Sequence, residues 1–219
     1  GREELKALYQ TNDKITELNW QRLRHMDLRE GLTPAVLAYV GLQYQSMAPR
    51  VFTDSQWDYV RDHLYILSGF YGILRAMDGV VPYRLEMQAK LTVDGSRDLY
   101  GYWGDAIYRR LTDGEDHPLI VNLASKEYSR AVEPWLRPGD RFVTCVFGEE
   151  GTDRNGRPKV KVKATQAKMA RGSMVRYLAE IRGETEEDLK GFQEEGFRFR
   201  EDLSGDGELV FIRKPEDRT

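Results

Sequence analysis

The chain has 219 residues, enough for one large domain or two small ones, and either could bury a substantial core. Charged residues make up 32% of it, yet 33 Lys and Arg against 36 Asp and Glu leave a net charge of −3. This balance excludes a protein coated with positive charge, so any binding site for a polyanion must be a local patch.

Cysteine content excludes two further classes of protein. The one cysteine, Cys145, allows neither a disulfide framework nor a cysteine-based zinc site within the chain. It lies in the apolar run 142–147, which predicts a buried, unreactive thiol. No apolar stretch is long enough to span a bilayer and no signal-peptide pattern opens the chain, so we expect a cytoplasmic protein with no membrane partner.

Up to about residue 112 the apolar spacing is helical. Thr33-Pro34 has the form of an N-cap followed by proline at the first helical position and predicts a helix that runs to Leu42. Thr53 has the capping-box spacing and opens another helix, and 98–111 predicts a third. A helix over 13–28 is expected to carry one apolar stripe, formed by Ile15, Leu18, Leu23 and Met26.

Beyond Pro118 the pattern becomes strand-rich, with Gly and Pro punctuation. One helix interrupts the strands and is expected to stop at Arg182-Gly183. No linker or repeat is present, so the whole chain, 1–219, is predicted to be a single α+β domain, mixed in structure, whose strand-rich C-terminal half packs on helices. The expected strands are 119–123, 141–147, 160–163, 197–200 and 208–212, the last two as a terminal hairpin.

The segment 167–176 is the strongest candidate for function, because it follows a lysine-rich strand and feeds a helix. If the helix begins near Gly172, its free N–H groups would lie beside Lys168 and Arg171 and suit a phosphate. If it begins near Ala167, the two cations share a face at i,i+3, and Gly172 costs about 1 kcal/mol inside the helix. An ordinary solvated basic face fits the spacing equally well.

Two further clusters are candidates. Arg84 and Glu86 are two residues apart on a predicted strand, so both point the same way and either pair or together hold a ligand. In 122–128 an apolar strand stops and polar groups crowd the turn into a helix, a favoured position for ligands. Ser125 followed by Glu127 equally suits a simple helix N-cap, which the spacing favours.

Recognisable enzyme motifs are absent from the sequence. The three histidines are far apart, and no cluster of Asp or Glu has metal-ligand spacing, so no metal site and no cofactor are expected. Neither a Walker loop, a GxSxG nor a GxGxxG sequence occurs. The two glycines of 68–72 stand in an apolar setting and predict close backbone packing rather than a phosphate loop.

Six segments carry motifs that are found together in one known family. They are Leu-Ser-Gly-Phe-Tyr-Gly-Ile-Leu-Arg at 67–75, Pro-Tyr-Arg-Leu-Glu-Met at 82–87, Leu-Tyr-Gly-Tyr-Trp-Gly-Asp at 99–105, then 122–128, 167–172 and 191–197. In this order, from about Leu5 to Ile212, they resemble the YaaA family of peroxide-stress proteins. The resemblance implies a bacterial cytoplasmic protein that lowers free intracellular iron under hydrogen peroxide. It also implies DNA binding, on an unusual α+β fold with a basic cleft and a helix-hairpin-helix element.

Members of that family begin with a short apolar strand and a motif like Ile-Ser-Pro-Ala-Lys. This chain opens at Gly1-Arg2-Glu3, so we expect that strand and its lysine to be missing and the cleft to lack one wall. The implied helix-hairpin-helix falls on 3–9, 11–13 and 14–26. Its turn holds no glycine, and Asp13 would repel a phosphate unless Lys14 compensates.

The leading hypothesis is a stress protein that binds duplex DNA through phosphates, largely independently of sequence. The alternative is an enzyme of unassigned chemistry that acts on a phosphorylated or nucleotide-like small molecule, with Glu86 or Glu127 as acid/base and Tyr83 or Tyr128 as proton donor. A long groove favours the first and a closed pocket the second. The residues expected to bind nucleic acid or another anion are Lys14, Arg84, Lys126, Lys168, Arg171 and Arg176. The further cleft candidates are Tyr83, Glu86, Asn122, Ser125, Glu127 and Tyr128.

Overall fold

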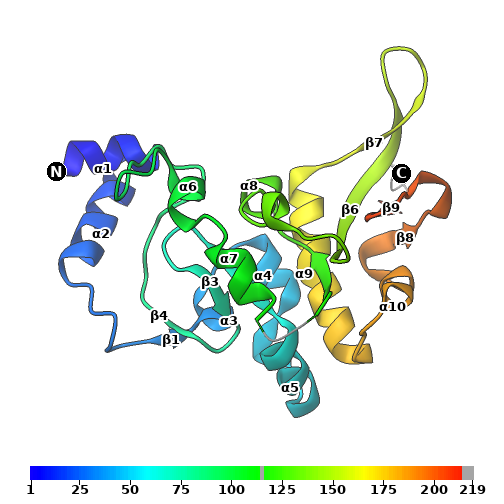
Figure 1. Ribbon diagram of the computed structural model, residues 1–219, viewed down its shortest axis with the longest axis horizontal. Helices are drawn as coiled ribbons and strands as arrows, with labels where there is room; N and C mark the ends of the chain where they lie inside the picture. The colour runs from blue at the N-terminus through cyan, green and yellow to red at the C-terminus, as the bar shows by residue number, and fades with distance from the viewer. Residues whose placement is uncertain (114–115, 214–219) are drawn as a thin grey trace, which may run out of the picture. The chain divides into compact units, whose positions relative to one another are not determined.

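The structure of the protein is a computed structural model that describes residues 1–113 and 116–213 (Figure 1). It is an α+β fold, as predicted. Contacts between Cα atoms divide it into two compact units. Of the described residues, the first unit holds 1–38, 65–113, 116 and 124–137, and the second holds 39–64, 117–123 and 138–213. Neither unit is a continuous half of the sequence.

The second unit is built on a mixed sheet in the order β5-β6-β9-β8, with β7 paired to the outer part of β6. β5 and β9 both run parallel to β6, whereas β7 and β8 are antiparallel to their neighbours. The predicted strands and the terminal hairpin are confirmed, although β6 extends well past 147 and β7 begins and ends two residues earlier than predicted. The strands are β5 (Leu119–Asn122), β6 (Arg141–Thr152), β7 (Pro158–Lys161), β8 (Phe197–Phe199) and β9 (Glu208–Arg213).

Helices from both sides of Pro118 complete this unit. The long helix α9 (Ala164–Ile181) packs on β6 and on two earlier helices, α4 (Leu42–Met47) and α5 (Asp54–His63). α5 begins with the predicted capping box, in which the Thr53 hydroxyl accepts from Gln56 N–H. The remaining helical elements are α10 (Glu186–Lys190) and the short 3₁₀ turns Pro49–Val51, Glu194–Gly196 and Glu201–Leu203.

Alternate residues of β6 supply the core of the second unit. Val143, Cys145 and Phe147 are each 1% exposed or less. The ring of Phe147 packs against three other buried phenylalanine rings, with centroid distances of 5.7 Å to Phe192, 5.4 Å to Phe197 and 5.2 Å to Phe211. An aromatic cluster of this size dominates the burial of apolar surface in a unit of this length.

Gly172 lies in the middle of α9, where a glycine weakens a helix. Its position is explained by the neighbouring helix, since a Cβ built on Gly172 would lie 1.9 Å from the backbone oxygen of Gln43 in α4. The missing side chain therefore allows the two helix backbones to approach. The cost to the helix is offset by the packing of α4 against α9.

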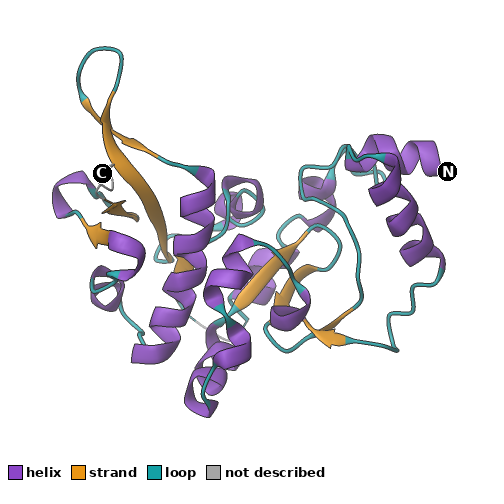
Figure 2. Ribbon diagram, turned by 180° about the vertical axis from the view of Figure 1, so that it is seen from behind, coloured by secondary structure: helices purple, strands orange, loops and turns teal. Residues whose placement is uncertain are grey.

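The first unit contains short elements joined by long loops (Figure 2). β2 and β3 form an antiparallel hairpin, and β1 pairs with β4. The predicted close packing of the two glycines is confirmed: an added Cβ would lie 2.7 Å from Leu85 O at Gly69 and 2.9 Å from the Trp103 ring at Gly72. The elements are α1 (Arg2–Tyr9), α2 (Asp13–Arg24), β1 (Thr33–Pro34), α3 (Ala35–Ala38), β2 (Tyr65–Ser68), β3 (Gly72–Arg75), β4 (Gly79–Val80), α6 (Leu99–Trp103), α7 (Ala106–Leu111), α8 (Lys126–Ser129) and the 3₁₀ turn Glu133–Trp135.

Three predicted helices are shorter than expected, and one of them, α2, ends at Arg24 instead of reaching residue 28. The helix predicted over 98–111 is broken into α6 and α7, because Gly104 has φ +50° and ψ −130°, a conformation that a helix cannot contain. Thr33 does not cap a helix: it pairs with Val80 in β1, and α3 ends at Ala38. The chain then passes through Gly41, with φ +131°, before α4 begins.

The apolar stripe of α2 also differs from the expected packing. Ile15, Leu18 and Leu23 are 37%, 50% and 38% exposed, and the buried residues of this helix are Thr16 and Asn19. Hydrogen bonds along the helix make this possible: the Thr16 hydroxyl donates to Asn12 O, and the Asn19 amide donates to Ile15 O. The packed face of α2 is therefore polar.

An ion pair at the start of α10 predicts a pH dependence of stability. Arg141 donates to the Glu186 carboxylate from both Nε and Nη2, the latter at 2.9 Å, and this hydrogen bonding lowers the pKa of Glu186 below its ordinary 4.5. A lowered folded-state pKa stabilises the fold above the unfolded value, and that contribution is lost as pH falls through the folded value. We expect Glu186→Gln to be less stable than the wild type near neutral pH, with the difference closing below pH 4.5. Urea unfolding of both proteins between about pH 7 and pH 3 measures the difference in stability. A difference that stays constant down to about pH 3 would contradict the prediction.

Candidate anion-binding site

The sequence predicts that the helix of the segment 167–176 begins either near Gly172 or near Ala167, and the first residue of α9 decides between the two. The helix begins at Ala164, so Gly172 lies well inside it, and the interpretation of Gly172 as a helix N-terminus that binds phosphate is wrong. Lys168 and Arg171 are instead three residues apart on one continuous helix, and their side chains share a face. Their positive charges, rather than backbone N–H groups, are what this segment offers an anion.

Arg171 is half-buried and lacks a carboxylate partner among the described residues. Its Nε is buried and has no hydrogen-bond partner in that part of the chain. Burial lowers the pKa of the guanidinium, and the nearby Cys145 thiol acts weakly in the opposite direction. Arginine remains charged at neutral pH even so, and a buried donor left without an acceptor costs about 1–3 kcal/mol. A bound anion would supply that acceptor.

Cys145, on β6, lies close enough to Arg171 for their charges to interact, and it is 1% exposed. Burial raises the pKa of its thiol to about 12, although Arg171 acts in the opposite direction. A thiol with this pKa is protonated at neutral pH and a poor nucleophile. The prediction of a buried thiol is confirmed.

Three further polar residues of α9 are either exposed or paired. Lys168 is exposed and forms no ion pair within the described residues. Arg176 contacts Glu194 at 3.4 Å from Nη2 to Oε2, so its charge is partly neutralised. The buried Ser173 hydroxyl donates to Glu195 at 2.5 Å. The strongest uncompensated positive charge on α9 is therefore at Lys168 and Arg171.

Asn122, at the end of β5, is 8% exposed and belongs to the same unit. Its amide nitrogen donates to the Thr144 hydroxyl at 3.1 Å, which ties β5 to β6. The Gln43 side chain donates to Leu123 O at 3.4 Å, so α4 also contacts this strand end. These bonds give Asn122 a structural role at the end of the strand.

In the first unit, Arg84 and Glu86 form the predicted pair, with 3.0 Å from Nη2 to Oε1. They do not lie on a strand, because residues 81–86 have no regular secondary structure, and the loop conformation brings the two side chains together. Arg84 Nε, like that of Arg171, is buried without a hydrogen-bond partner in the described ranges. Burial raises the pKa of the Tyr9 hydroxyl, and the charge of Arg84 opposes this, which places α1 beside the same loop.

Tyr83 is held in an aromatic cluster. Its hydroxyl lies 2.5 Å from the Ser68 hydroxyl, and Ser68 Oγ also accepts from the N–H groups of Phe70 and Tyr71. The Tyr83 ring packs 5.1 Å from Phe70 and 5.4 Å from Tyr71, centroid to centroid. These contacts fix the phenol in place and engage its oxygen.

The candidates around α8 are engaged in contacts within the first unit. Ser125 occupies the N-cap position, as the spacing favoured, but its side chain makes no capping bond. Glu127 Oε1 accepts from Gln88 N–H at 3.3 Å, so the carboxylate holds the loop that follows Glu86. Lys126 pairs with Glu133 at 2.5 Å. The last candidate of this group, Tyr128, is half-buried and has a partner of its own.

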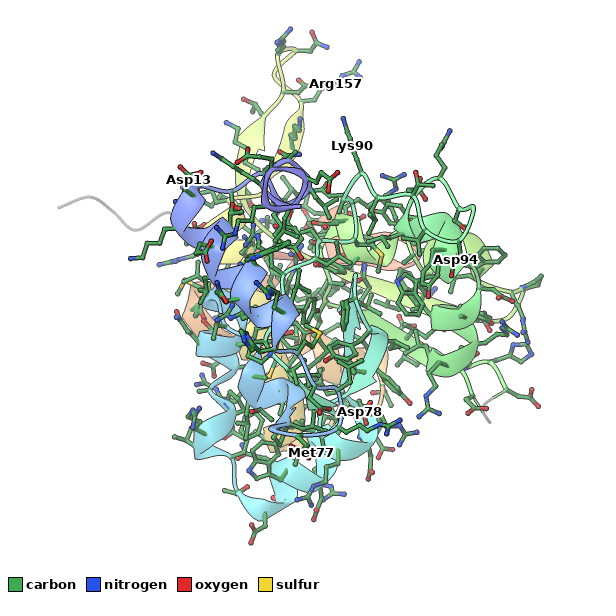
Figure 3. The ribbon with its side chains drawn as sticks, turned by 90° about the vertical axis from the view of Figure 1, so that its left-hand side faces the viewer. Asp13, Met77, Asp78, Lys90, Asp94 and Arg157 are labelled. Atoms are coloured by element: carbon green, nitrogen blue, oxygen red, sulfur yellow. The ribbon has the colours of Figure 1, made fainter. Side chains whose placement is uncertain are left out.

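Two helices joined by a short turn, α1 and α2, stand where the helix-hairpin-helix is expected, and their assignment as that DNA-binding element stays a prediction. The turn holds Gln10 at φ +48°, and Asn12 caps α2 by accepting from Ile15 N–H. Asp13, labelled in Figure 3, pairs with Lys6 at 2.5 Å, so α1 rather than Lys14 compensates its charge. Lys14 is exposed and forms no ion pair within 1–113 and 116–213.

The structure therefore brings together two sets of predicted residues. Lys168 and Arg171 share a face of α9 in the second unit, while Arg84, Glu86 and Glu127 surround one loop of the first. The single cleft expected to unite them stays a prediction. Sequence spacing missed Tyr9, Gln43 and Glu195, because each meets its partner only through the tertiary fold.

Two general features of the described residues bear on the site. Within them, no group of three or more His, Cys, Asp or Glu side chains is placed to hold a metal ion. Over the same ranges, 1–113 and 116–213, no helix has the length and apolar character needed to cross a membrane.

Known proteins match this chain over nearly its whole length. The family described as Peroxide stress protein YaaA matches residues 1–203. A UPF0246 protein of Agathobacter rectalis is 52% identical over 214 residues, which cover 98% of this chain and 83% of the relative. Those of Ligilactobacillus salivarius and Pediococcus pentosaceus are 50% and 48% identical, over 96% of this chain and 83% and 81% of their own lengths.

Proposed function

The chain belongs to the peroxide stress protein YaaA family, and we propose that it acts in the stress response by binding duplex DNA through phosphate contacts that are largely independent of sequence. Family membership confirms the resemblance drawn from the motifs. The proposal includes the limitation of free intracellular iron, which the resemblance implies for members of the family. The unpaired cations of this chain support the DNA-binding part of the proposal.

One observation carries the proposal: Lys168 and Arg171 share a helix face and have no carboxylate partner in the described part of the chain. Three other candidate cations, Arg84, Lys126 and Arg176, are each paired with a carboxylate. Two neighbouring cations left unpaired keep their full charge for an external anion. Lys14, on α2, is a third candidate that forms no ion pair with any described residue.

The test is a titration of duplex DNA with Lys168→Ala/Arg171→Ala at several salt concentrations, followed by fluorescence anisotropy. Each lost phosphate contact reduces the slope of log K against log salt by about 0.9, so we expect a slope lower by about 1.8, with unchanged sequence preference. The matched control is Arg50→Ala/Arg97→Ala, which removes the same charge from two exposed positions.

Thermal unfolding of both variants shows whether the fold is retained. This control matters most for Arg171, which is half-buried, whereas an exposed cation such as Lys168 usually contributes within about 0.5 kcal/mol to stability. A folded double variant with the affinity and salt slope of the wild type would refute this role for α9. A wild-type protein that does not bind duplex DNA would refute the proposed function itself.

A second function is favoured by the burial of Arg171. A guanidinium with a buried, unpartnered Nε suits a compact anion, such as the phosphate of a nucleotide-like small molecule, better than the exposed backbone of a duplex. Inorganic phosphate and a nucleotide can be titrated against the wild type and Arg171→Ala in the same way. Binding of either one to the wild type but not to Arg171→Ala would favour this alternative. To act as acid or base in such an enzyme, Glu86 would have to leave its ion pair with Arg84, and Glu127 its contact with Gln88 N–H.

A further inference from the structure

The outer half of β6 forms a two-stranded ribbon with β7. β5 pairs with β6 only as far as Thr144, and β9 only as far as Gly148. From Glu149 to Thr152, β6 pairs with β7 alone. The ribbon and its turn project from the sheet of the second unit, in yellow-green in Figure 1, and Figure 2 shows the same projection from behind.

The turn of this ribbon is well defined. Asp153 Oδ1 accepts from the N–H groups of Asn155 and Arg157 at 2.8 and 2.9 Å, and Asp153 N–H donates to Arg157 O at 2.9 Å. Gly156 supplies the positive φ of +76° that the turn needs. The one carboxylate at the end of the ribbon is thus used to build the turn.

Unpaired cations line the ribbon. Arg154 and Arg157 in the turn and Lys159 and Lys161 on β7 are all exposed, and none forms an ion pair within the described residues. Arg157 is labelled at the projecting end in Figure 3. By contrast, each carboxylate on the outer part of β6 is neutralised from elsewhere in the same unit: Glu149 by Lys163 at 2.6 Å, and Glu150 by Arg200.

The register places both lysines on one face of the ribbon. Lys161 lies opposite Glu149 and Lys159 opposite Gly151, and cross-strand partners share a face. At Gly151 an added Cβ would lie 2.5 Å from Cε of Lys161, so the glycine leaves room for the lysine stem to cross the neighbouring strand. The positive charge of the ribbon is therefore concentrated on one face and on its turn.

We propose that the β6–β7 ribbon is a second DNA-binding element, which enters the major groove of a duplex and contacts its phosphates through Arg154, Arg157, Lys159 and Lys161. A major groove about 12 Å wide admits a two-stranded ribbon, and cations on its outer face and turn then reach the phosphates of the groove walls. This inference rests on the proposed function but uses none of the α9 residues. It gives an acidic protein a basic surface on a projecting element.

The first experiment replaces all four cations by glutamine, which keeps the side-chain stems. Loss of two to four phosphate contacts lowers the slope of log K against log salt by about 1.8 to 3.6. If the affinity at 1 M salt is unchanged, binding at 0.1 M salt is then weaker by about 60- to 4,000-fold. The matched control removes the same charge from exposed cations outside the ribbon that form no ion pair in the described part of the chain. It is expected to change the affinity less than about threefold. Its substitutions are Arg29→Gln, Arg50→Gln, Lys90→Gln and Arg97→Gln.

A second experiment places a probe in the turn. Because Cys145 is buried with a thiol pKa of about 12, a thiol-reactive fluorophore labels Asn155→Cys selectively in the folded protein. We expect its emission to change on addition of duplex DNA, with a midpoint at the concentration where anisotropy reports binding. The same label on Ser55→Cys, an exposed position on α5, is expected to stay unchanged.

The outcomes separate this inference from the function on which it rests. If the wild type binds duplex DNA and the glutamine variant, folded by thermal unfolding, keeps its affinity and slope, the ribbon is not a binding element while the function stands. If the wild type does not bind duplex DNA, both fail. The third experiment measures binding to vesicles of phosphatidylserine and phosphatidylcholine. If the wild type binds these vesicles but not duplex DNA, and the glutamine variant binds neither, the inference is overturned in favour of an anionic lipid surface.

Discussion

Replacement of Gly172 by alanine is expected to lower the free energy of unfolding by about 3 kcal/mol. Alanine alone would strengthen the helix by about 1 kcal/mol, but its Cβ would lie 1.9 Å from Gln43 O, so α4 and α9 must separate. Both sides of this overlap are helix backbone, which cannot move aside as a side-chain end can. Urea unfolding of Gly172→Ala, followed by circular dichroism, measures the effect.

The matched control is Gly205→Ala. An added Cβ at Gly205 meets nothing within 4 Å, and its φ lies outside the positive range, so alanine there is neutral or stabilising by a few tenths of a kcal/mol. Equal stability of Gly172→Ala and the wild type would mean that the close approach of α4 and α9 is absent in solution.

Removal of the Phe147 ring is expected to destabilise the protein still more, by about 4 kcal/mol for Phe147→Ala. The ring is 1% exposed and contacts Phe192, Phe197 and Phe211, so its loss leaves a cavity walled by other rings that cannot collapse without breaking their own packing. Phe147→Leu refills most of the volume and is expected to cost less than about 1.5 kcal/mol.

The same urea titrations measure both Phe147 variants, with the slope m as a check that unfolding remains two-state. A loss below about 1 kcal/mol for Phe147→Ala would show that this cluster does not hold the second unit together.

Local signals in the sequence predicted most of the second unit. Period-two and continuous apolar runs located all five strands, and the capping box at Thr53 located α5, because these patterns depend on residues close together in the chain. The same signals failed where tertiary contacts dominate. Gly104 interrupts a periodic apolar segment that otherwise predicts one helix, and the apolar stripe of α2 is exposed while Thr16 and Asn19 are buried.

The candidate site was predictable in its residue types but not in its partners. Spacing gave the pairing of Arg84 with Glu86 as one of two alternatives, on a predicted strand that the structure replaces by a loop. It could not give the partners of Glu127 or Ser173, which lie 39 and 22 residues away along the chain. Spacing also could not show that the carboxylates on β6 are neutralised by distant cations. Glu150, for example, pairs with Arg200, which lies 50 residues away along the chain.

The position of β9 has a consequence for synthesis on the ribosome. This strand is translated after every other strand of its sheet, yet it stands inside the sheet between β6 and β8. Until Glu208–Arg213 has emerged, β6 presents an open edge and Phe147 lacks the ring of Phe211. The nascent chain therefore carries an unfinished sheet from the emergence of β6 to that of β9, a state that chaperones bind and that is prone to aggregate. A translational pause between these two strands would prolong that exposure, whereas a pause before β6 would not.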